Sequence, residues 1–231
     1  MKEVFLEDLT LQLFASHGEE ILDLLADKES SRYVESEHTF KTANQETPDV
    51  SENAVPLRLM AATIAHVAKT TPSGGAILAF LPGMAEIKAL DLFLSSKQSL
   101  GVNFADASKF KICLVHSGLH DKQSEAFADV LAGCRKIIIA TNIAETSIII
   151  PDVKHVIDSG KHREYVYHHA SKMSTLSTIW ISKSNAKQRA GRAGRVQNGN
   201  YYALFSQARY ESLKAVQTPE IHWSDLQEIC L

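Results

Sequence analysis

Short apolar runs recur along the chain from residue 51 onward, separated by stretches in which apolar residues follow helical spacing. The runs are AILAF at 76–80, KICLVH at 111–116, KIIIA at 136–140, HVID at 155–158 and YYALF at 201–205. Nearly continuous apolar runs of this length are typical of strands that are buried on both faces. The predicted helices between them span residues 54–69, 84–95, 122–131 and 184–192. This alternation predicts an α/β fold with a parallel sheet, in which loops at the carboxyl ends of the strands form the site.

Residues 163–182 interrupt the alternation with two β-rich halves, EYVYHH and TLSTIWIS, around Ala170–Met173. This pattern predicts a β-hairpin that projects from the sheet. At the amino end of the chain, Phe5 to Leu25 has apolar residues at helical spacing and is predicted to form one or two helices. Residues 27–52 are polar, lack glycine and contain few large apolar groups, so we expect a mobile loop or linker there.

The charged residues are distributed unevenly along the chain. Residues 1–55 contain 4 Lys+Arg and 13 Asp+Glu, whereas the remainder contains 20 Lys+Arg and 14 Asp+Glu. Between Gly160 and Arg195, eight basic residues accompany a single acidic residue, Glu164. A local basic field of this kind suits a polyanionic partner, although composition alone favours a solvated basic face.

Cysteine, histidine and apolar content argue against several classes of protein. The three cysteines, Cys113, Cys134 and Cys230, form no C-x-x-C pair, which argues against a disulfide framework and a zinc site. The ten histidines form no pattern that indicates a metal site. No apolar stretch is long enough to span a bilayer, and the first residues lack the basic-then-apolar order of a signal peptide. We therefore expect an intracellular protein from a reducing compartment.

The segment Gln188–Arg195, QRAGRAGR, repeats arginine at every third position, on and just after a helix that Ser184 is expected to cap. Such an arrangement presents fixed cations to a phosphate chain, with bidentate contacts where the geometry permits. A basic helix on a solvent face is the alternative. The intervening glycines favour phosphate binding, because glycine costs about 1 kcal/mol in a helix interior and a solvated face does not need it.

This octapeptide resembles motif VI of superfamily 2 helicases. The segment 140–147, ATNIAETS, resembles motif V of the DEAH/RHA helicases, and the two segments occur in the family's order and separation. Further similar segments are FLPGMAEI at 80–87 (motif IV), VHS at 115–117 (the short motif after it) and TPEI at 218–221 (the passage into a winged-helix domain). The resemblance covers about residues 72–226.

The resemblance implies a RecA-like parallel sheet flanked by helices, and it identifies residues 53–217 as the second RecA-like motor domain of an ATP-dependent RNA helicase. Residues 1–52 are then an N-terminal helical segment with a mobile linker, and residues 218–231 are the start of the following winged-helix domain. The FLPG form of motif IV is more similar to multidomain RNA helicases than to splicing helicases. We therefore expect a cytoplasmic rather than a nuclear protein.

The resemblance assigns catalytic roles within QRAGRAGR. Arg192 and Arg195 match the paired arginine fingers of the family, which reach the β- and γ-phosphates of ATP. Cations placed where charge develops lower the barrier to phosphoryl transfer, in agreement with this role. Gln188 matches the residue that helps to position the attacking water, and Arg189 is expected to tie this domain to its partner domain.

Three residues match nucleotide-binding positions of the family. Phe127 falls where the family places an aromatic residue over the adenine, although an amphipathic core residue is an equal alternative. Ser147 matches a residue near the nucleotide. Asp152 lies where the family often has an acid that contacts the ribose, with a one-residue offset at Pro151.

The expected RNA contacts lie where predicted strands end. The Thr141 hydroxyl and nearby backbone N–H groups are expected to meet RNA phosphates. Similar candidates are Gly83, Ser117 and Asn142. Gly83 is alternatively needed only for a turn. The hairpin matches the element that meets RNA at the strand-separation point, where packing within the hairpin is the alternative to base stacking. The aromatic candidates for stacking are Tyr165, Tyr167 and Trp180.

The sequence contains no G-x-x-x-x-G-K-[ST] and no Asp-Glu-x-His. The phosphate cradle and the Mg²⁺ ligands used with ATP are therefore expected in a preceding RecA-like domain, so this chain looks like a fragment that is inactive alone. One alternative is a complete NTPase with an unusual cradle, which the absent P-loop opposes. Another is a binding module on a degenerate motor domain, which the intact QRAGRAGR opposes. The expected partners are RNA and the two neighbouring domains of the same protein.

Overall fold

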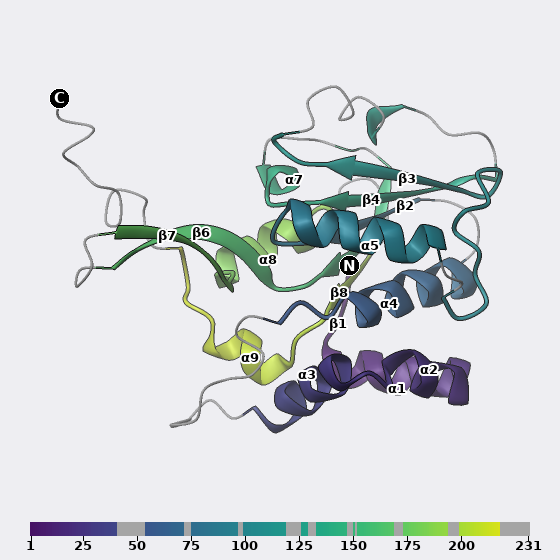
Figure 1. Cartoon of the computed structure of the whole chain (residues 1–231), viewed down its shortest axis with the longest axis horizontal. Coiled ribbons are helices and arrows are strands. Elements are labelled where there is room, and N and C mark those ends of the chain that lie inside the picture. Colours follow the sequence, from purple (N-terminus) through teal and green to yellow (C-terminus); the bar gives the residue numbers. More distant parts are fainter. Residues whose placement is uncertain are drawn as a thin grey trace.

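The computed structural model describes residues 1–40, 54–71, 75–96, 99–118, 126–128, 133–146, 150, 152–168, 173–193 and 199–217. Within these residues, six parallel strands form one sheet in the order β1-β8-β5-β2-β4-β3 (Figure 1). Their bounds are β1 Lys2–Val4, β2 Ala76–Phe80, β3 Phe110–Val115, β4 Arg135–Ala140, β5 Val153–Asp158 and β8 Asn200–Ala203. The predicted α/β fold with a parallel sheet is confirmed.

The central strands are apolar throughout because each face of the sheet lies against its own hydrophobic layer. Side chains alternate between the two faces along a strand. In β2, Ile77 and Ala79 enter one layer, whereas Leu78 and Phe80 enter the other. Every residue of β2 and of β4 is buried, as the continuous apolar runs predicted.

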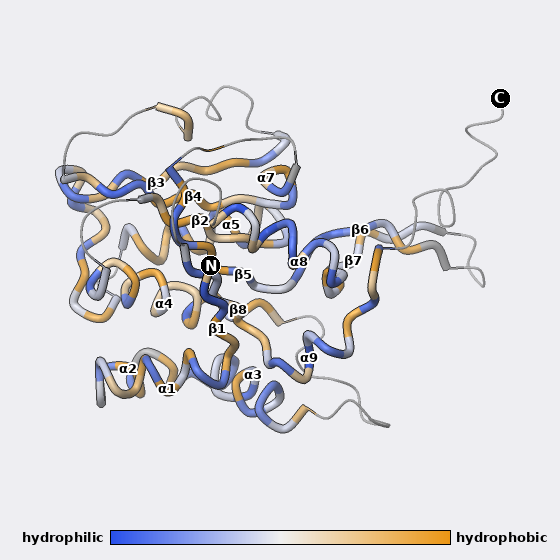
Figure 2. Tube along the Cα trace, turned by 180° about the vertical axis from the view of Figure 1, so that it is seen from behind, coloured by the Kyte–Doolittle hydropathy of each residue, from blue (hydrophilic) through white to orange (hydrophobic). Residues whose placement is uncertain are grey.

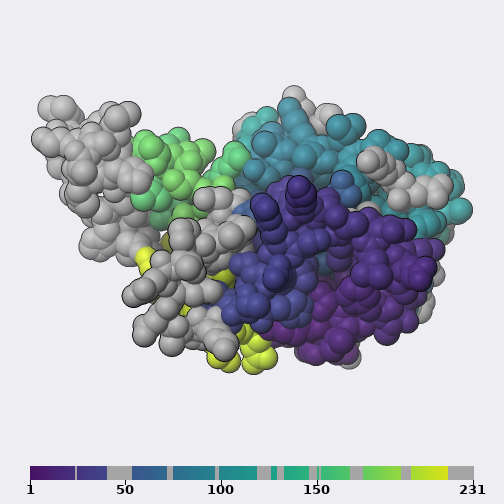
Figure 3. Space-filling view, turned by 60° about the horizontal axis from the view of Figure 1, so that its bottom comes forward, coloured from purple at the N-terminus to yellow at the C-terminus, as the bar shows by residue number. Residues whose placement is uncertain are grey.

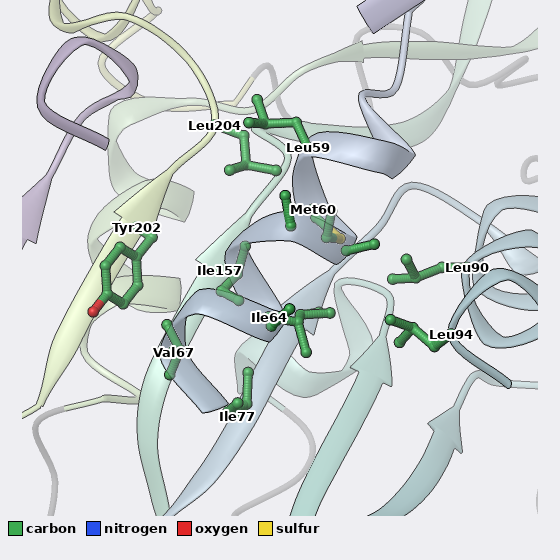
Figure 4. Packing of buried hydrophobic residues seen from close by; sticks show 14 of the residues in the cluster. Leu59, Met60, Ile64, Val67, Ile77, Leu90, Leu94, Ile157, Tyr202 and Leu204 are labelled. Carbon is green, nitrogen blue, oxygen red and sulfur yellow. The ribbon is translucent and has the colours of Figure 1, made fainter. Parts of the chain in front are cut away.

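In the part of the chain that the structure describes, five helices cover one face of the sheet: α1 Leu6–His17, α2 Glu19–Leu25, α3 Lys28–Thr39, α4 Leu57–Thr70 and α5 Met84–Ser96 (Figure 1). Figure 4 shows α4 at the centre of this layer, with Ile64 near Ile77 of β2 and with Leu90 and Leu94 of α5 beyond Met60. The opposite layer receives alanines from the short helix α7, Ile143–Thr146, and from α8, Lys183–Ala190. Small residues let these two helices approach the sheet closely. The last described helix, α9 Gln207–Ser212, follows β8.

The predicted hairpin is present as a separate two-stranded antiparallel sheet, formed by β6 Lys161–His168 and β7 Met173–Trp180. It extends away from the six-stranded sheet (Figure 1). Tyr165 and Leu176 face each other across its strands and are both about half exposed. Figure 2 shows apolar and polar residues mixed along this arm, as expected for a ribbon in contact with solvent.

The prediction of a mobile segment is wrong for residues 28–39, which form helix α3. The Asp27 carboxylate caps this helix by accepting hydrogen bonds from the backbone N–H groups of Glu29 and Ser30. The buried Tyr33 hydroxyl donates to the Leu204 carbonyl oxygen at 2.7 Å. Tertiary contacts therefore supply the stabilisation that the polar composition did not indicate. Residues 41–52 of the expected linker lie outside the described residues.

The first residues of the chain join the same sheet, which the sequence did not indicate. β1 pairs in parallel with β8, and its Val4 is buried in the core. Three residues are too few to show a strand periodicity. The predicted winged-helix start at 218–231 and most of the predicted helix at 122–131 lie outside the described residues. Within the described ranges, no helix has the length and apolar content needed to cross a membrane.

Candidate functional site

The loops that follow β2, β3, β4 and β5 meet at the carboxyl edge of the sheet. The backbone hydrogen bonds that join these loops to neighbouring strands run from Leu81 to Ala140, from Thr141 to Val115 and from Ser159 to Phe80. The structure thereby gathers the predicted RNA-binding positions at one edge of the sheet. These positions are Gly83, Ser117, Thr141 and Asn142.

These four positions differ in what they offer to a ligand. Ser117 and Asn142 are exposed, so their hydroxyl and amide groups face solvent. Thr141 is 6% exposed, and its backbone N–H donates to the Val115 carbonyl oxygen at 3.3 Å. The parallel sheet therefore already uses the Thr141 N–H, and the predicted phosphate contacts stay with the Thr141 hydroxyl and the nearby backbone N–H groups of the loop.

Gly83 lies against a cation that the sequence reasoning missed. A Cβ atom at this position would lie 2.7 Å from the guanidinium carbon of Arg163, which belongs to β6. Arg163 donates from Nη2 to both carboxylate oxygens of Glu86, at 2.9 and 3.3 Å. The absence of a side chain at Gly83 thus admits the Arg163–Glu86 pair to the carboxyl edge. In the sequence, the only indication of this cation was that the predicted hairpin begins with a basic residue, Arg163.

Helix α8 carries the first part of QRAGRAGR, and its cap is Ser182 rather than the predicted Ser184. The Ser182 hydroxyl oxygen accepts from the Asn185 backbone N–H at 3.2 Å, and the Asn185 side chain accepts in return from the Ser182 backbone N–H. This reciprocal capping box satisfies two N–H groups of the first turn. The helix start is therefore fixed at the base of the hairpin.

Arg189 is fully buried between two carboxylates of its own domain. Its Nε donates to Glu145 at 2.6 Å, and its Nη1 donates to Asp158 at 2.7 Å. Burial opposes the charge of the guanidinium, but the charges of Asp158 and Glu145 outweigh burial and raise the pKa of Arg189. The expectation that Arg189 reaches a partner domain is wrong, because its cation is already used within this one.

Two acidic residues that the sequence reasoning did not single out complete this network. Glu145 also accepts from the Asn185 side-chain amide at 2.9 Å, and Asp158 accepts from the Tyr201 hydroxyl at 2.8 Å. Burial and the nearby charge of Asp158 raise the pKa of Tyr201 well above its usual value. Asp158 is the last residue of the apolar strand β5. A carboxylate in such a buried position needs a partner, so the sequence did contain a signal for this ion pair.

The predicted catalytic residues occupy different environments. Gln188 is exposed on α8. Arg192 is 7% exposed and is engaged within the domain. Arg195 and Ser147 lie outside the described residues. The structure therefore places Gln188 at the surface and buries the Arg192 side chain.

The remaining nucleotide candidates lie toward the opposite, amino-terminal edge of the sheet. The ammonium group of Lys136 is 3.2 Å from the Asp152 carboxylate and donates to the Ala126 carbonyl oxygen at 3.0 Å. One buried lysine thus joins Asp152 to Ala126, the residue before Phe127. The Phe127 ring is 45% exposed. Asp152 precedes β5, so this candidate lies apart from the loops at the carboxyl ends of the strands.

QRAGRAGR extends toward this same edge after α8 ends. A side chain at Gly199 would overlap the carbonyl oxygens of both Ala193 and Lys154. Lys154 is the second residue of β5 and lies two positions after Asp152. The arginine segment therefore begins beside the carboxyl edge, at Arg189, and approaches the amino edge at Ala193.

The hairpin aromatics divide into packed and exposed residues. The Lys161 ammonium lies 3.3 Å from the centre of the Trp180 ring, whose edge packs against Phe205. Trp180 therefore belongs to the packing at the hairpin base, as the alternative interpretation held. Tyr165 is 53% exposed and remains a candidate for base stacking, whereas the Tyr167 side chain lies outside what the structure describes.

Comparisons with known proteins agree with this arrangement. The family model for the helicase conserved C-terminal domain matches residues 61–197. The chain is 48% identical over 158 residues to "ATP-dependent RNA helicase dhx29" of Xenopus laevis, covering 68% of this chain and 11% of that protein. It is 44% identical over 183 residues to "ATP-dependent DNA/RNA helicase DHX36" of Mus musculus, covering 79% of this chain and 18% of that protein.

A solved structure shares the fold. The "DExH-box NTPase HrpB" of E. coli superposes with a TM-score of 0.64 at 30% identity, covering 74% of this chain and 20% of that chain. The chain thus spans between about a tenth and a fifth of the length of these relatives. From the family match, the RecA-like sheet and the two helicase segments joined through Arg189, the chain belongs to the helicase conserved C-terminal domain family, as a second RecA-like domain of the DEAH/RHA type.

Proposed function

We propose that this chain works as the second RecA-like domain of an ATP-dependent RNA helicase, and that it hydrolyses ATP only together with a first RecA-like domain. The observation that carries the proposal is the pair of contacts from Glu145 to Asn185 and Arg189. These contacts join the loop after β4, at the carboxyl edge of the sheet, to the helix that leads to Arg192. A buried ion pair of this kind is costly to break, so the two segments move as one body.

RNA is the polyanion that fits the carboxyl edge. Ser117 and Asn142 offer exposed donors, and such groups hold phosphate oxygens without reading base sequence. Arg163, about one third exposed, adds a cation whose present partner is Glu86. A phosphate would compete with the Glu86 carboxylate for the same guanidinium. The exposed Tyr165 on the hairpin suits stacking on a base.

The described residues fit one wall of an ATP site rather than a complete site. Phe127 offers an exposed ring for the adenine, and Asp152 is held by the buried Lys136. No G-x-x-x-x-G-K-[ST] occurs in the sequence, so a first domain would supply the phosphate cradle and the Mg²⁺ ligands. ATP bound between the two domains would supply the free energy for movement along RNA. Arg192 would have to leave its present contacts as the domains close.

A second candidate function follows from the burial of Arg192. An arginine finger must reach a phosphate, whereas the Arg192 side chain is 7% exposed. A domain that binds RNA at its carboxyl edge and uses Arg192 for stability alone would show the same burial. This RNA-binding module needs no contribution to hydrolysis.

The test compares variants in the longer protein that carries both motor domains. Arg192→Lys and Arg195→Lys should each lower the ATP turnover number by roughly 10³-fold or more, because lysine keeps the charge but loses the planar fork. RNA affinity should stay unchanged. Thr141→Ala should lower RNA-stimulated turnover more than basal turnover. Lys187→Ala is the control, because Lys187 is an exposed basic residue on the same helix. It should change neither the basal nor the RNA-stimulated turnover of ATP.

Near-normal turnover in Arg192→Lys, together with a lowered melting temperature, would support the RNA-binding module instead. The 231-residue chain alone should release no phosphate from ATP above background. Phosphate release that scales with the concentration of this chain and disappears in Arg192→Ala would contradict the need for a first domain.

A further inference from the structure

The amino-terminal helices carry a second apolar stripe that the fold does not bury. The buried stripe of α1 consists of Leu6, Leu9 and Leu13. A helix packed on one core needs one such stripe. On the outer side, however, Leu11 is 68% exposed and Phe14, three residues later, is 42% exposed. Leu22 of α2 is 54% exposed, so the stripe continues from one helix to the next.

A groove of about 500 Å³ lies beside this stripe, between α1, α2 and α3. Its apolar lining includes Phe14, Leu22, Leu25 and Val34. Asp23 and Glu35 line the same groove and are exposed. Figure 3 views the molecule from the side on which these helices form the surface. We call this feature, with its apolar floor and its two carboxylates, the acidic groove.

The charge around the acidic groove decides what kind of partner fits it. Residues 1–40 contain ten Asp+Glu and three Lys+Arg. Glu19 and Glu20 at the start of α2 are exposed, as is Glu29 on α3. A nucleic acid would be repelled by this field, so RNA is a poor occupant. A cationic partner with an apolar face meets both the charge and the exposed side chains.

We propose that the acidic groove binds a basic amphipathic helix of a partner protein. Such a helix would place apolar side chains at three- and four-residue spacing onto Phe14 and Leu22. Its flanking Lys or Arg side chains would meet Asp23 and Glu35. The groove is built from α1, α2 and α3, whereas the RNA candidates lie on loops after the strands. The partner and RNA therefore bind at the same time, so this inference stands apart from the proposed function.

The probe is a fluorescein-labelled peptide of about 18 residues in which leucine and lysine alternate with helical period. Fluorescence anisotropy measures its binding to the chain, beside a scrambled peptide and a peptide with glutamate in place of lysine. The variant pairs are Phe14→Ser with Leu22→Ser, and Asp23→Lys with Glu35→Lys. The matched controls are Leu92→Ser, whose leucine is 68% exposed on α5, and Glu211→Lys, whose carboxylate is exposed on α9.

The basic amphipathic peptide should bind with a micromolar dissociation constant, and each variant pair should weaken binding by roughly 10-fold or more. The controls should stay within about 2-fold of the unchanged chain, and all variants should keep its melting temperature. A saturating single-stranded RNA should not displace the peptide.

Three outcomes would overturn the proposal. Equal binding of the scrambled peptide, or equal weakening by Glu211→Lys, would reduce the effect to non-specific charge attraction. A dimer in sedimentation that Leu22→Ser dissociates would assign the groove to a second copy of the chain. In the longer protein, amide exchange of α1 and α2 that is slowed without peptide, relative to this chain, would assign the groove to another domain of that protein.

Discussion

Arg189 and Glu145 form a buried ion pair in which Nε of the guanidinium lies 2.6 Å from Oε1 of the carboxylate. The two residues are 44 positions apart in the sequence and belong to the two segments that most resemble helicase motifs. Removing ions from water is costly, and this pair offsets the cost with Asp158 on the other side of the guanidinium. The pair therefore fixes the relative position of the two segments.

Arg189→Met should lower the free energy of unfolding by about 3–5 kcal/mol, because it leaves two carboxylates buried without their cation. Lys187→Met is the control, since Lys187 is exposed on the same helix, and it should change this free energy by less than about 0.5 kcal/mol. Urea unfolding followed by circular dichroism measures both. A loss below about 1 kcal/mol for Arg189→Met would show that the network matters less than its burial indicates.

Gly83→Ala should displace the Arg163 guanidinium, because the new Cβ would lie 2.7 Å from its carbon atom. We expect a loss of about 1 kcal/mol in the free energy of unfolding as the Arg163–Glu86 pair is disturbed. The same substitution in an Arg163→Ala background should be nearly neutral. The double-mutant cycle is read from urea unfolding, and an equal loss in both backgrounds would assign Gly83 to its backbone turn alone.

Helix α3 should show slow amide exchange over residues 28–39, contrary to the mobile segment expected from composition. Glu37 connects this helix to Arg209, whose Nη2 donates to its carboxylate at 2.9 Å. Glu37→Gln should accelerate exchange across α3 and lower stability by about 2 kcal/mol, because a charged hydrogen bond is weakened in a buried place. Glu35→Gln, at an exposed position of the same helix, should leave exchange unchanged. Fast exchange throughout α3 in the unchanged chain would contradict the structure.

His155 should make the fold sensitive to mild acid. Burial, and then the charges of Arg135 and Lys154, lower the pKa of His155 to about 4, and its ring nitrogens have no hydrogen-bond partner among the described residues. Above pH 6.5 the ring is neutral in both states, so its contribution to stability is fully present. As the pH falls from 6.5 toward 4, the unfolded chain binds the proton first, and roughly 3 kcal/mol is progressively lost.

The measurement for His155 is the free energy of unfolding at several pH values between 7.5 and 4.5, a range of about three pH units. His155→Phe removes the titrating ring, so its stability relative to the unchanged chain should improve as the pH falls. His38→Gln, at an exposed position, should follow the unchanged chain at every pH. If the His155→Phe difference were constant across this range, the buried ring would not be the source of the acid sensitivity.

The sequence predicted the strands of the sheet core, the helices α4, α5 and α8 and the hairpin within a few residues. These elements are legible because hydrophobic periodicity is a local property of the chain. In the same way, the resemblance of QRAGRAGR and ATNIAETS to helicase motifs needs neighbouring residues only. The four positions proposed for RNA binding follow predicted strands and lie at one edge of the sheet, because the carboxyl ends of parallel strands share that edge.

Contacts between distant residues decided the rest. Helix α3 is held by Tyr33 and Glu37, which bind Leu204 and Arg209 across separations of 171 and 172 residues. The sequence predicted that Arg189 ties this domain to a partner domain, yet the fold buries Arg189 against Glu145 and Asp158. The groups that surround a charged side chain in space decide what it binds, and a buried charge needs an opposite charge or hydrogen bonds beside it. The sequence thus determined the central strands, the helices α4, α5 and α8 and the hairpin, whereas the tertiary structure decided the place of α3 and the partners of Arg189.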